Sequence, residues 1–323
     1  MASKRGQVPA RTESVAATGA SRQKPGLREV YVVWLLFALT AVAVFATYWR
    51  IPPGELWKVS QSGFAGGAGR AFVFLSYSAA LAAIAIVAIA VDRLGGRGAT
   101  ALGVAAVVLC ATVAIPGVQT ENDLDAKWAN LPAVLGVGLA VGLTVWAAAK
   151  GRPERVVTSA AGDVARLVTG CVALLFAAPY IAAELGFFLD KVPLLGWVFQ
   201  TGRLRPEPGG GFVHAAVHHG HHHGLDGFLL AVTALLLSRL LGGFRRPRLR
   251  ALTAVYLSLM LVYGLANMAN DLWAEQVVKR GWTGWQIPDV LFPSVSVAWA
   301  LILGCAAVVY LACWRERRLV GRR

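Results

Sequence analysis

Charged residues are scarce in this chain. Asp, Glu, Lys and Arg make up 15% of its 323 residues, whereas they make up about 25% of a typical soluble protein. Hydrophobic residues account for 57% of the sequence. These proportions argue against a soluble globular protein and favour an integral membrane protein.

Cysteine is also scarce, and the sequence patterns of several common active sites are missing. The four cysteines each fall inside an apolar run and none forms a CxxC pair: Cys110, Cys171, Cys305 and Cys313. This argues against a disulfide framework or a thiolate metal site and favours small buried side chains. The HExxH, GxSxG and phosphate-loop patterns are absent, so zincin proteolysis, serine hydrolysis and nucleotide binding have no support.

Long apolar runs are abundant. A bilayer core of about 30 Å needs roughly 20 mostly apolar residues per helix. Eight runs qualify or nearly qualify: Val30–Tyr48, Ala71–Val91, Ala99–Val118, Leu131–Ala149, Leu167–Leu185, His218–Leu241, Leu252–Asn270 and Val290–Trp314. We therefore expect an all-α fold over residues 28–323, a polytopic membrane bundle of about eight transmembrane helices. Residues 1–27, rich in small residues and scattered charges, should form a disordered basic cytoplasmic tail.

The distribution of charge predicts the orientation of the bundle. With eight spans, both termini lie on one side, and that side carries 22 of the 31 Lys and Arg residues but only 6 of the 17 acidic residues. The positive-inside rule therefore places both termini in the cytoplasm, as in a multi-pass protein of the plasma membrane. The formal net charge of +14 is then expected to meet anionic lipids at the cytoplasmic face. Nucleic acid is not an expected partner.

Histidine is confined to one short segment, residues 212–226, which faces outward in this orientation. It holds all six histidines of the chain: His214, His218, His219, His221, His222 and His223. If a helix begins near Val213, then His214, His218, His222 and Asp226 recur every four residues on one face. Gly220 and Gly224 weaken such a helix, so a looped form that brings the rings together is also open.

The seventh apolar run carries polar residues at the matching height. The connection over residues 242–250 is short, so the sixth and seventh runs should be antiparallel neighbours. Asp226 and Ala266 are the same number of residues from the centre of this connection. Asp226 should therefore lie at the height of Ala266, near Asn267, Asn270 and Asp271. Imidazoles and carboxylates together suit Zn, Cu, Fe or Mn. The sequence therefore predicts a transition-metal site between these two helices, to which Glu184 and Glu275 could contribute.

Three functions fit these features. The first, which we favour, is metal binding, sensing or handling at the outer surface. The second is a membrane metalloenzyme acting on a lipid or lipid-linked envelope substrate, with Asp271 or Glu275 as general base. Its substrate would meet Glu184, Arg203, Arg205, Lys279 and Arg280. The third is a structural or assembly subunit of a membrane complex, in which metal is incidental; the chain could also form a homo-oligomer. For the histidine segment itself, three alternatives to a specific metal site are open: it could collect metal loosely, titrate as a pH sensor or ligate haem.

The segment over residues 186–200 is too apolar for a solvated loop. It also contains Asp190, Lys191 and Pro193, which make it a poor ninth span. We expect it to lie along the outer surface as an interfacial piece, next to the histidine segment.

Overall fold

A computed structural model describes residues 26–50, 59–115, 117–118, 124–150, 160–186, 189, 192–199, 204–206, 213–215, 223–288 and 290–314, with only the backbone for 204–206, 213–215 and 223. Helices dominate these residues, and a single short two-stranded ladder supplies the strands among them. Eight helical segments are long and apolar enough to cross a membrane. The expected all-α class is thus confirmed, and so is the expected number of helices long and apolar enough to span a membrane.

The first half of the chain contributes four of these segments. Its helices are α1 (Arg28–Arg50), α2 (Gly63–Phe74), the π-helical turn η2 (Leu75–Ala79), α3 (Ala80–Leu94), α4 (Gly96–Ala111), the 3-10 turns η3 (Thr112–Ala114) and η4 (Trp128–Asn130), and α5 (Leu131–Ala149). α2, η2 and α3 run on as one span of 32 residues. Gly95 and Gly96 have φ of 65° and 79°, a conformation that glycine adopts at little cost, so α3 can turn directly into α4.

The second half contributes the other four segments and the strands. Its elements are α6 (Asp163–Glu184), α7 (Leu195–Val198), β1 (Leu204–Pro206), β2 (Val213–Ala215), α8 (His223–Ser238), the 3-10 turn η6 (Arg239–Gly243), α9 (Pro247–Trp273), the π-helical turn η7 (Ala274–Val278), α10 (Val297–Val309) and the π-helical turn η8 (Tyr310–Trp314). The strands β1 and β2 pair antiparallel, with Arg205 opposite His214.

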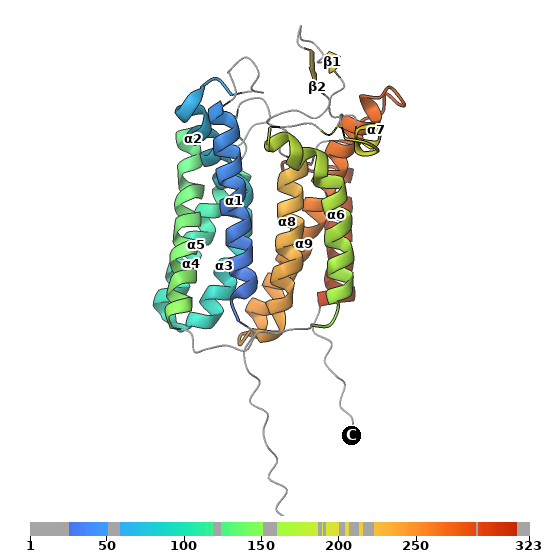
Figure 1. Ribbon diagram of the computed structural model, residues 1–323. Helices are drawn as coiled ribbons and strands as arrows, with labels where there is room; N and C mark the ends of the chain where they lie inside the picture. The colour runs from blue at the N-terminus through green and yellow to red at the C-terminus, as the bar shows by residue number, and fades with distance from the viewer. Residues whose placement is uncertain are drawn as a thin grey trace, which may run out of the picture.

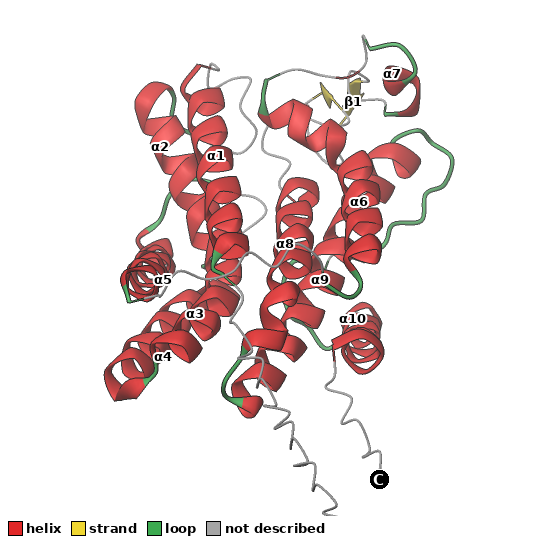
Figure 2. Cartoon of the chain, turned by 60° about the horizontal axis from the view of Figure 1, so that its bottom comes forward, coloured by secondary structure: helices red, strands yellow, loops and turns green. Residues whose placement is uncertain are grey.

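The helices form two groups that stand side by side. Figures 1 and 2 both show α1 to α5 on one side and α6, α8, α9 and α10 on the other, with α1 and α3 next to α8 and α9. One continuous apolar core joins the groups, and it includes Phe37, Phe74, Ile86, Leu230 and Leu257. Alanines fill much of α3, and such small side chains let neighbouring helices approach closely.

Basic residues and their partners tie the groups together at one end of the bundle, which we call the basic end. The Arg239 guanidinium lies 2.7 Å from the Glu29 carboxylate. The Asp92 carboxylate accepts hydrogen bonds from the backbone N–H groups of Arg245 and Arg246, at 2.8 and 3.0 Å. Arg250 donates to the backbone oxygen of Trp314 at 3.4 Å. The first span therefore begins, at residue 28, at the same end of the bundle at which the last span ends, at residue 314.

Several boundaries differ from those expected. The third span ends at Ala114, because a 3-10 turn closes it before Pro116. The second and seventh spans each extend to 32 residues: α2 begins the second at Gly63, before the apolar run, and the π-helical turn η7 carries the seventh past its run to Val278. The expected interfacial segment contains the short helix α7, whose Trp197 side chain is exposed. Residues 1–25, most of the expected tail, lie outside the described residues.

Candidate functional site

The helices α8 and α9 pack against each other through two glycines. A Cβ atom added to Gly227 would lie 2.4 Å from the backbone oxygen of Gly264, and one added to Gly264 would lie 2.5 Å from the backbone oxygen of Gly227. Side chains would not fit at this crossing, and small residues at a helix crossing are typical of membrane bundles. The two helices are antiparallel neighbours (Figure 1), as the short connection between them predicts.

Asp271 of α9 binds the beginning of α8. One oxygen of its carboxylate accepts a hydrogen bond from the backbone N–H of Gly224, at 2.5 Å, and the side chain is buried. The first N–H groups of a helix have no partner within the helix and carry its partial positive charge, so a carboxylate is well placed there. Gly224 also packs on the ring of Tyr180, where an added Cβ would lie 2.4 Å from a ring carbon.

Asp226 lies two residues further along α8 and faces the other group of helices. Its carboxylate accepts a hydrogen bond from the Ser78 hydroxyl, at 2.7 Å, and both side chains are buried. Ser78 belongs to the π-helical turn η2. Such turns change the direction in which side chains point, and they are frequent at functional sites. This contact joins the two groups of helices at the end opposite to the basic end.

Glu184 ends α6 close to the same place. Its carboxylate is buried and interacts electrostatically with Arg70 and with Asp226. Arg70 of α2 is only 2% exposed, and its guanidinium lies 5.8 Å from the centre of the Tyr48 ring. The hydroxyl of Thr47 in α1 donates a hydrogen bond to the backbone oxygen of Glu184. α1 and α2 therefore both contact the end of α6.

Glu275 continues the polar row along α9. Asn267, Asp271 and Glu275 are spaced four residues apart and are all buried on the face toward the bundle. Glu275 lies 2.7 Å from the ammonium group of Lys279, and it interacts electrostatically with Asp271. We call the four buried carboxylates Glu184, Asp226, Asp271 and Glu275 the acidic centre. Within it, Glu184 interacts with Asp226 and Asp271 with Glu275, so the acidic centre consists of two pairs of neighbouring carboxyl groups.

Three other residues expected at the site donate hydrogen bonds to backbone oxygens outside α8. The side-chain amide of Asn270 donates to the backbone oxygens of Ile287 and Pro288, at 3.0 and 3.1 Å, in the connection to α10. Arg280 donates to backbone oxygens of α7, and its guanidinium lies 4.7 Å from the centre of the Trp282 ring. Asn267 donates to the backbone oxygen of Tyr263 in its own helix, at 2.9 Å.

The histidines lie largely outside the described residues. This holds for His218, His219, His221 and His222, and also for Arg203. For His214 and Arg205, in β2 and β1, and for His223, the first residue of α8, the backbone alone is described. The prediction that one continuous helix runs from His214 to Asp226 is wrong, because Val213–Ala215 is a strand and the helix begins at His223. Among the described residues, no group of three or more His, Cys, Asp and Glu side chains could hold a metal ion.

Four residues that contact the acidic centre escaped sequence reasoning: Tyr48, Arg70, Ser78 and Tyr180. Only Arg70 gave a usable signal, since it is the one basic residue between Gly63 and Val91, and a charge there requires a partner or water. Ser78 and the two tyrosines stand in ordinary apolar surroundings in the sequence.

Comparison with known proteins gave no relative. No family model, no curated protein and no solved structure matches the chain.

Proposed function

We propose that this protein spans the plasma membrane eight times with both termini in the cytoplasm, and that it binds a transition-metal ion at its outer side. The orientation is supported by the basic end, where Arg93, Arg239, Arg245, Arg246 and Arg250 gather. Cytoplasmic surfaces of membrane proteins are enriched in such residues. Anionic lipids of the inner leaflet are the partners that this end suits.

The depth of the acidic centre supports a functional role. Asp226 precedes Arg239 by thirteen residues, which is about 20 Å of helix. With Arg239 at the inner surface of a core of about 30 Å, Asp226 lies within the outer half of the membrane. Ionisable groups at that depth are costly, and those that proteins retain usually serve a function.

The observation that carries the proposal is the hydrogen bond from Gly224 N–H to Asp271. Gly224 directly follows His223 in the chain. Because consecutive Cα atoms lie 3.8 Å apart, the end of the histidine segment is held beside the acidic centre whatever path the rest of the segment takes. We propose that imidazoles of this segment join the carboxylates as ligands, a combination that suits Zn, Cu, Fe or Mn.

The charges of the acidic centre also favour a bound cation. Among the described residues, the cationic side chain of Arg70 lies near Glu184 and that of Lys279 near Glu275. Two like charges in a buried place repel each other, and a nearby cation reduces that repulsion. A divalent ion held partly by histidines would stabilise the remaining carboxylates in their charged form.

Binding fits the structure better than transport or catalysis. Between Asp226 and the basic end, the buried polar side chains of α8, η6 and α9 are hydroxyls and Asn267, with no carboxylate to pass a cation onward. As for catalysis, Asp271 already accepts the Gly224 N–H, and Glu275 is paired with Lys279. Neither is placed as a free general base. We propose that the histidines capture the ion and that Asp226 and Asp271 hold it close to the outer surface.

Elemental analysis of the purified full-length protein tests this proposal. The wild type should retain close to stoichiometric transition metal after dialysis, and Asp226→Asn combined with Asp271→Asn should lose most of it. A second variant, with His222 and His223 both replaced by Gln, should lose it without altering the described carboxylates. Asp163→Asn, at the opposite end of the bundle, is the matched control and should bind metal normally. Equal and near-zero metal in the wild type and in every variant would refute the proposal.

A further inference from the structure

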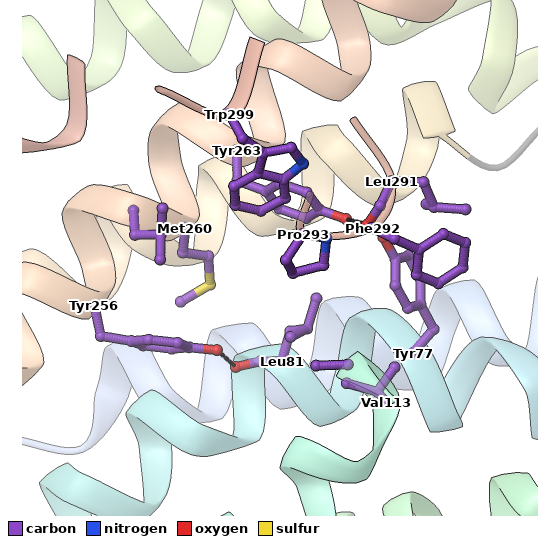
Figure 3. A pocket seen from close by; sticks show the side chains of 12 residues that line it. Tyr77, Leu81, Val113, Tyr256, Met260, Tyr263, Leu291, Phe292, Pro293 and Trp299 are labelled. Atoms are coloured by element: carbon purple, nitrogen blue, oxygen red, sulfur yellow. Dashed lines mark hydrogen bonds between the residues drawn. The ribbon is translucent and has the colours of Figure 1, made fainter. Parts of the chain in front are cut away.

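A cavity separate from the acidic centre lies between α3, α9, the turn η3 and the residues that precede α10 (Figure 3). Its volume is about 170 Å³ and its lining is almost wholly apolar. Five aromatic side chains contribute to the lining: Tyr77, Tyr256, Tyr263, Phe292 and Trp299. Aliphatic side chains and Pro293 complete it.

Hydrogen bonds fix the tyrosines in the wall of the cavity. The Tyr256 hydroxyl donates to the backbone oxygen of Leu81 at 2.7 Å, and the Tyr263 hydroxyl donates to the backbone oxygen of Leu291 at 2.8 Å. The hydroxyls of Tyr77 and Tyr263 are also hydrogen-bonded to each other, as Figure 3 shows. The wall is thus held in shape without a ligand, which is typical of binding sites for small molecules.

Trp299 offers the one feature of the cavity that calls for a polar partner. Its indole N–H is buried and has no hydrogen-bond acceptor among the described residues. Its ring lies 5.7 Å from the ring of Tyr263, in the wall. A buried donor without an acceptor is unfavourable, because it has lost its hydrogen bond to water. A ligand with a carbonyl oxygen would supply that acceptor.

The cavity opens on the side of the bundle. Ala114 and Pro293 of its lining are exposed, and Phe292 is half-buried between them and the interior. Tyr263 is sixteen residues along α9 from Pro247, about 24 Å from the basic end. This is the depth of the hydrocarbon core in the proposed orientation, so a ligand would enter from the lipid.

The size and lining of the cavity favour a flat ring over an acyl chain. An apolar cavity of about 150 Å³ in another protein holds one benzene molecule, so this cavity has room for a single six-membered ring. Aromatic side chains pair with other rings in stacked or edge-on arrangements, which stabilise the complex beyond the effect of the buried area. A saturated chain gains nothing from these arrangements, and it brings no acceptor to Trp299.

We propose that this cavity binds the ring of a membrane-soluble quinone, with the Trp299 indole N–H donating to a ring carbonyl and the apolar tail left in the lipid. The class of ligand follows from three properties that must occur together: a flat ring, a carbonyl acceptor and solubility in the bilayer. This inference does not depend on the metal site, because no residue of the acidic centre lines the cavity.

Calorimetric titration of the full-length protein in lipid nanodiscs with decyl-benzoquinone tests the proposal. Trp299→Phe keeps an aromatic ring and removes the N–H, so the quinone should bind about tenfold more weakly, the effect of one neutral hydrogen bond. Ala114→Trp should fill the exposed mouth and abolish binding. Trp128→Phe replaces a tryptophan that is 89% exposed, and it should bind as the wild type does.

Two further measurements make the test decisive. Decylbenzene has the ring and the tail without the carbonyls, so it should bind more weakly than the quinone and should not respond to Trp299→Phe. Size-exclusion profiles and thermal unfolding of each variant exclude misfolding as the cause of lost binding. Unchanged quinone affinity in Trp299→Phe, unchanged affinity in Ala114→Trp, or tighter binding of a free fatty acid than of the quinone would each overturn the proposal.

Discussion

Replacement of Gly264 by alanine tests whether the crossing of α8 and α9 is as close as the structure indicates. The added Cβ would lie 2.5 Å from the Gly227 oxygen and 3.0 Å from the Ala231 nitrogen, both backbone atoms, whereas ordinary contact begins at 3.4 Å. The helices would have to move apart by about 1 Å, because backbone cannot give way as a side chain can. Overpacking of this kind typically lowers the free energy of unfolding by about 1–3 kcal/mol.

The assay titrates SDS into the purified protein in detergent micelles, and circular dichroism monitors its unfolding. Gly142→Ala is the matched control, since Gly142 lies in the transmembrane helix α5 and an added Cβ would meet nothing within 4 Å. We expect no loss of stability there, because alanine favours a helix more than glycine does. If Gly264→Ala proved as stable as Gly142→Ala, the proposed contact between the two helices would be wrong.

Three further predictions concern other parts of the bundle. Ser78→Ala should lower the free energy of unfolding by about 1.5–3 kcal/mol, because a hydrogen bond to a buried carboxylate is lost; chemical denaturation measures this, and a change below 0.5 kcal/mol would contradict it. Gly136→Val should separate α4 from α5, since an added Cβ would lie 2.7 Å from the Cys110 nitrogen and sulfur, and Cys110 should then react with a permeant maleimide that leaves it untouched in the wild type. In a background without native cysteines, an impermeant maleimide should label Trp282→Cys in intact cells, and Arg97→Cys only after permeabilisation; the reverse pattern would overturn the proposed orientation.

The number and position of the spans could be predicted from the sequence because one physical requirement governs them. A helix that crosses a bilayer must be apolar over about 20 residues, and all eight expected runs lie largely within helices of sufficient length. The extensions beyond the runs were not predictable in the same way. Gly63–Phe74 and Ala274–Val278 contain glycines, charges or amides. Gly63–Phe74 packs on α1, whereas Ala274–Val278 continues α9.

The candidate site was predictable in its height and less so in its contacts. The short connection over residues 242–250 fixes α8 and α9 as antiparallel neighbours, so counting from its centre places Asp226 near Ala266. The structure has the adjacent Gly227 against Gly264 and Met268, which agrees with that count. The rotation of each helix about its axis is set by packing with helices far away in the sequence. For that reason the Ser78 partner of Asp226, 148 residues away in the chain, could not be foreseen.

The histidine segment shows a different limit of sequence reasoning. A spacing of four residues indicates a shared face only if the segment is helical, and the strand at Val213–Ala215 removes that condition for His214. Gly220 and Gly224 were the local signals against a continuous helix, because glycine disfavours helices by about 1 kcal/mol. The structure has α8 begin at His223, where the Asp271 carboxylate binds the first turn.

The acidic centre lies where the two groups of helices meet, and each group contributes a different kind of residue to it. The carboxylates Glu184 and Asp226 come from the second group, whereas Thr47, Arg70 and Ser78, which contact or face them, come from the first. A cation bound there would share carboxylate oxygens with Arg70 and Ser78. We therefore expect occupancy of the proposed site and contact between the two groups to be linked at the end opposite to the basic end. At the basic end, the contacts of Arg239 and Asp92 would hold the groups together in either state.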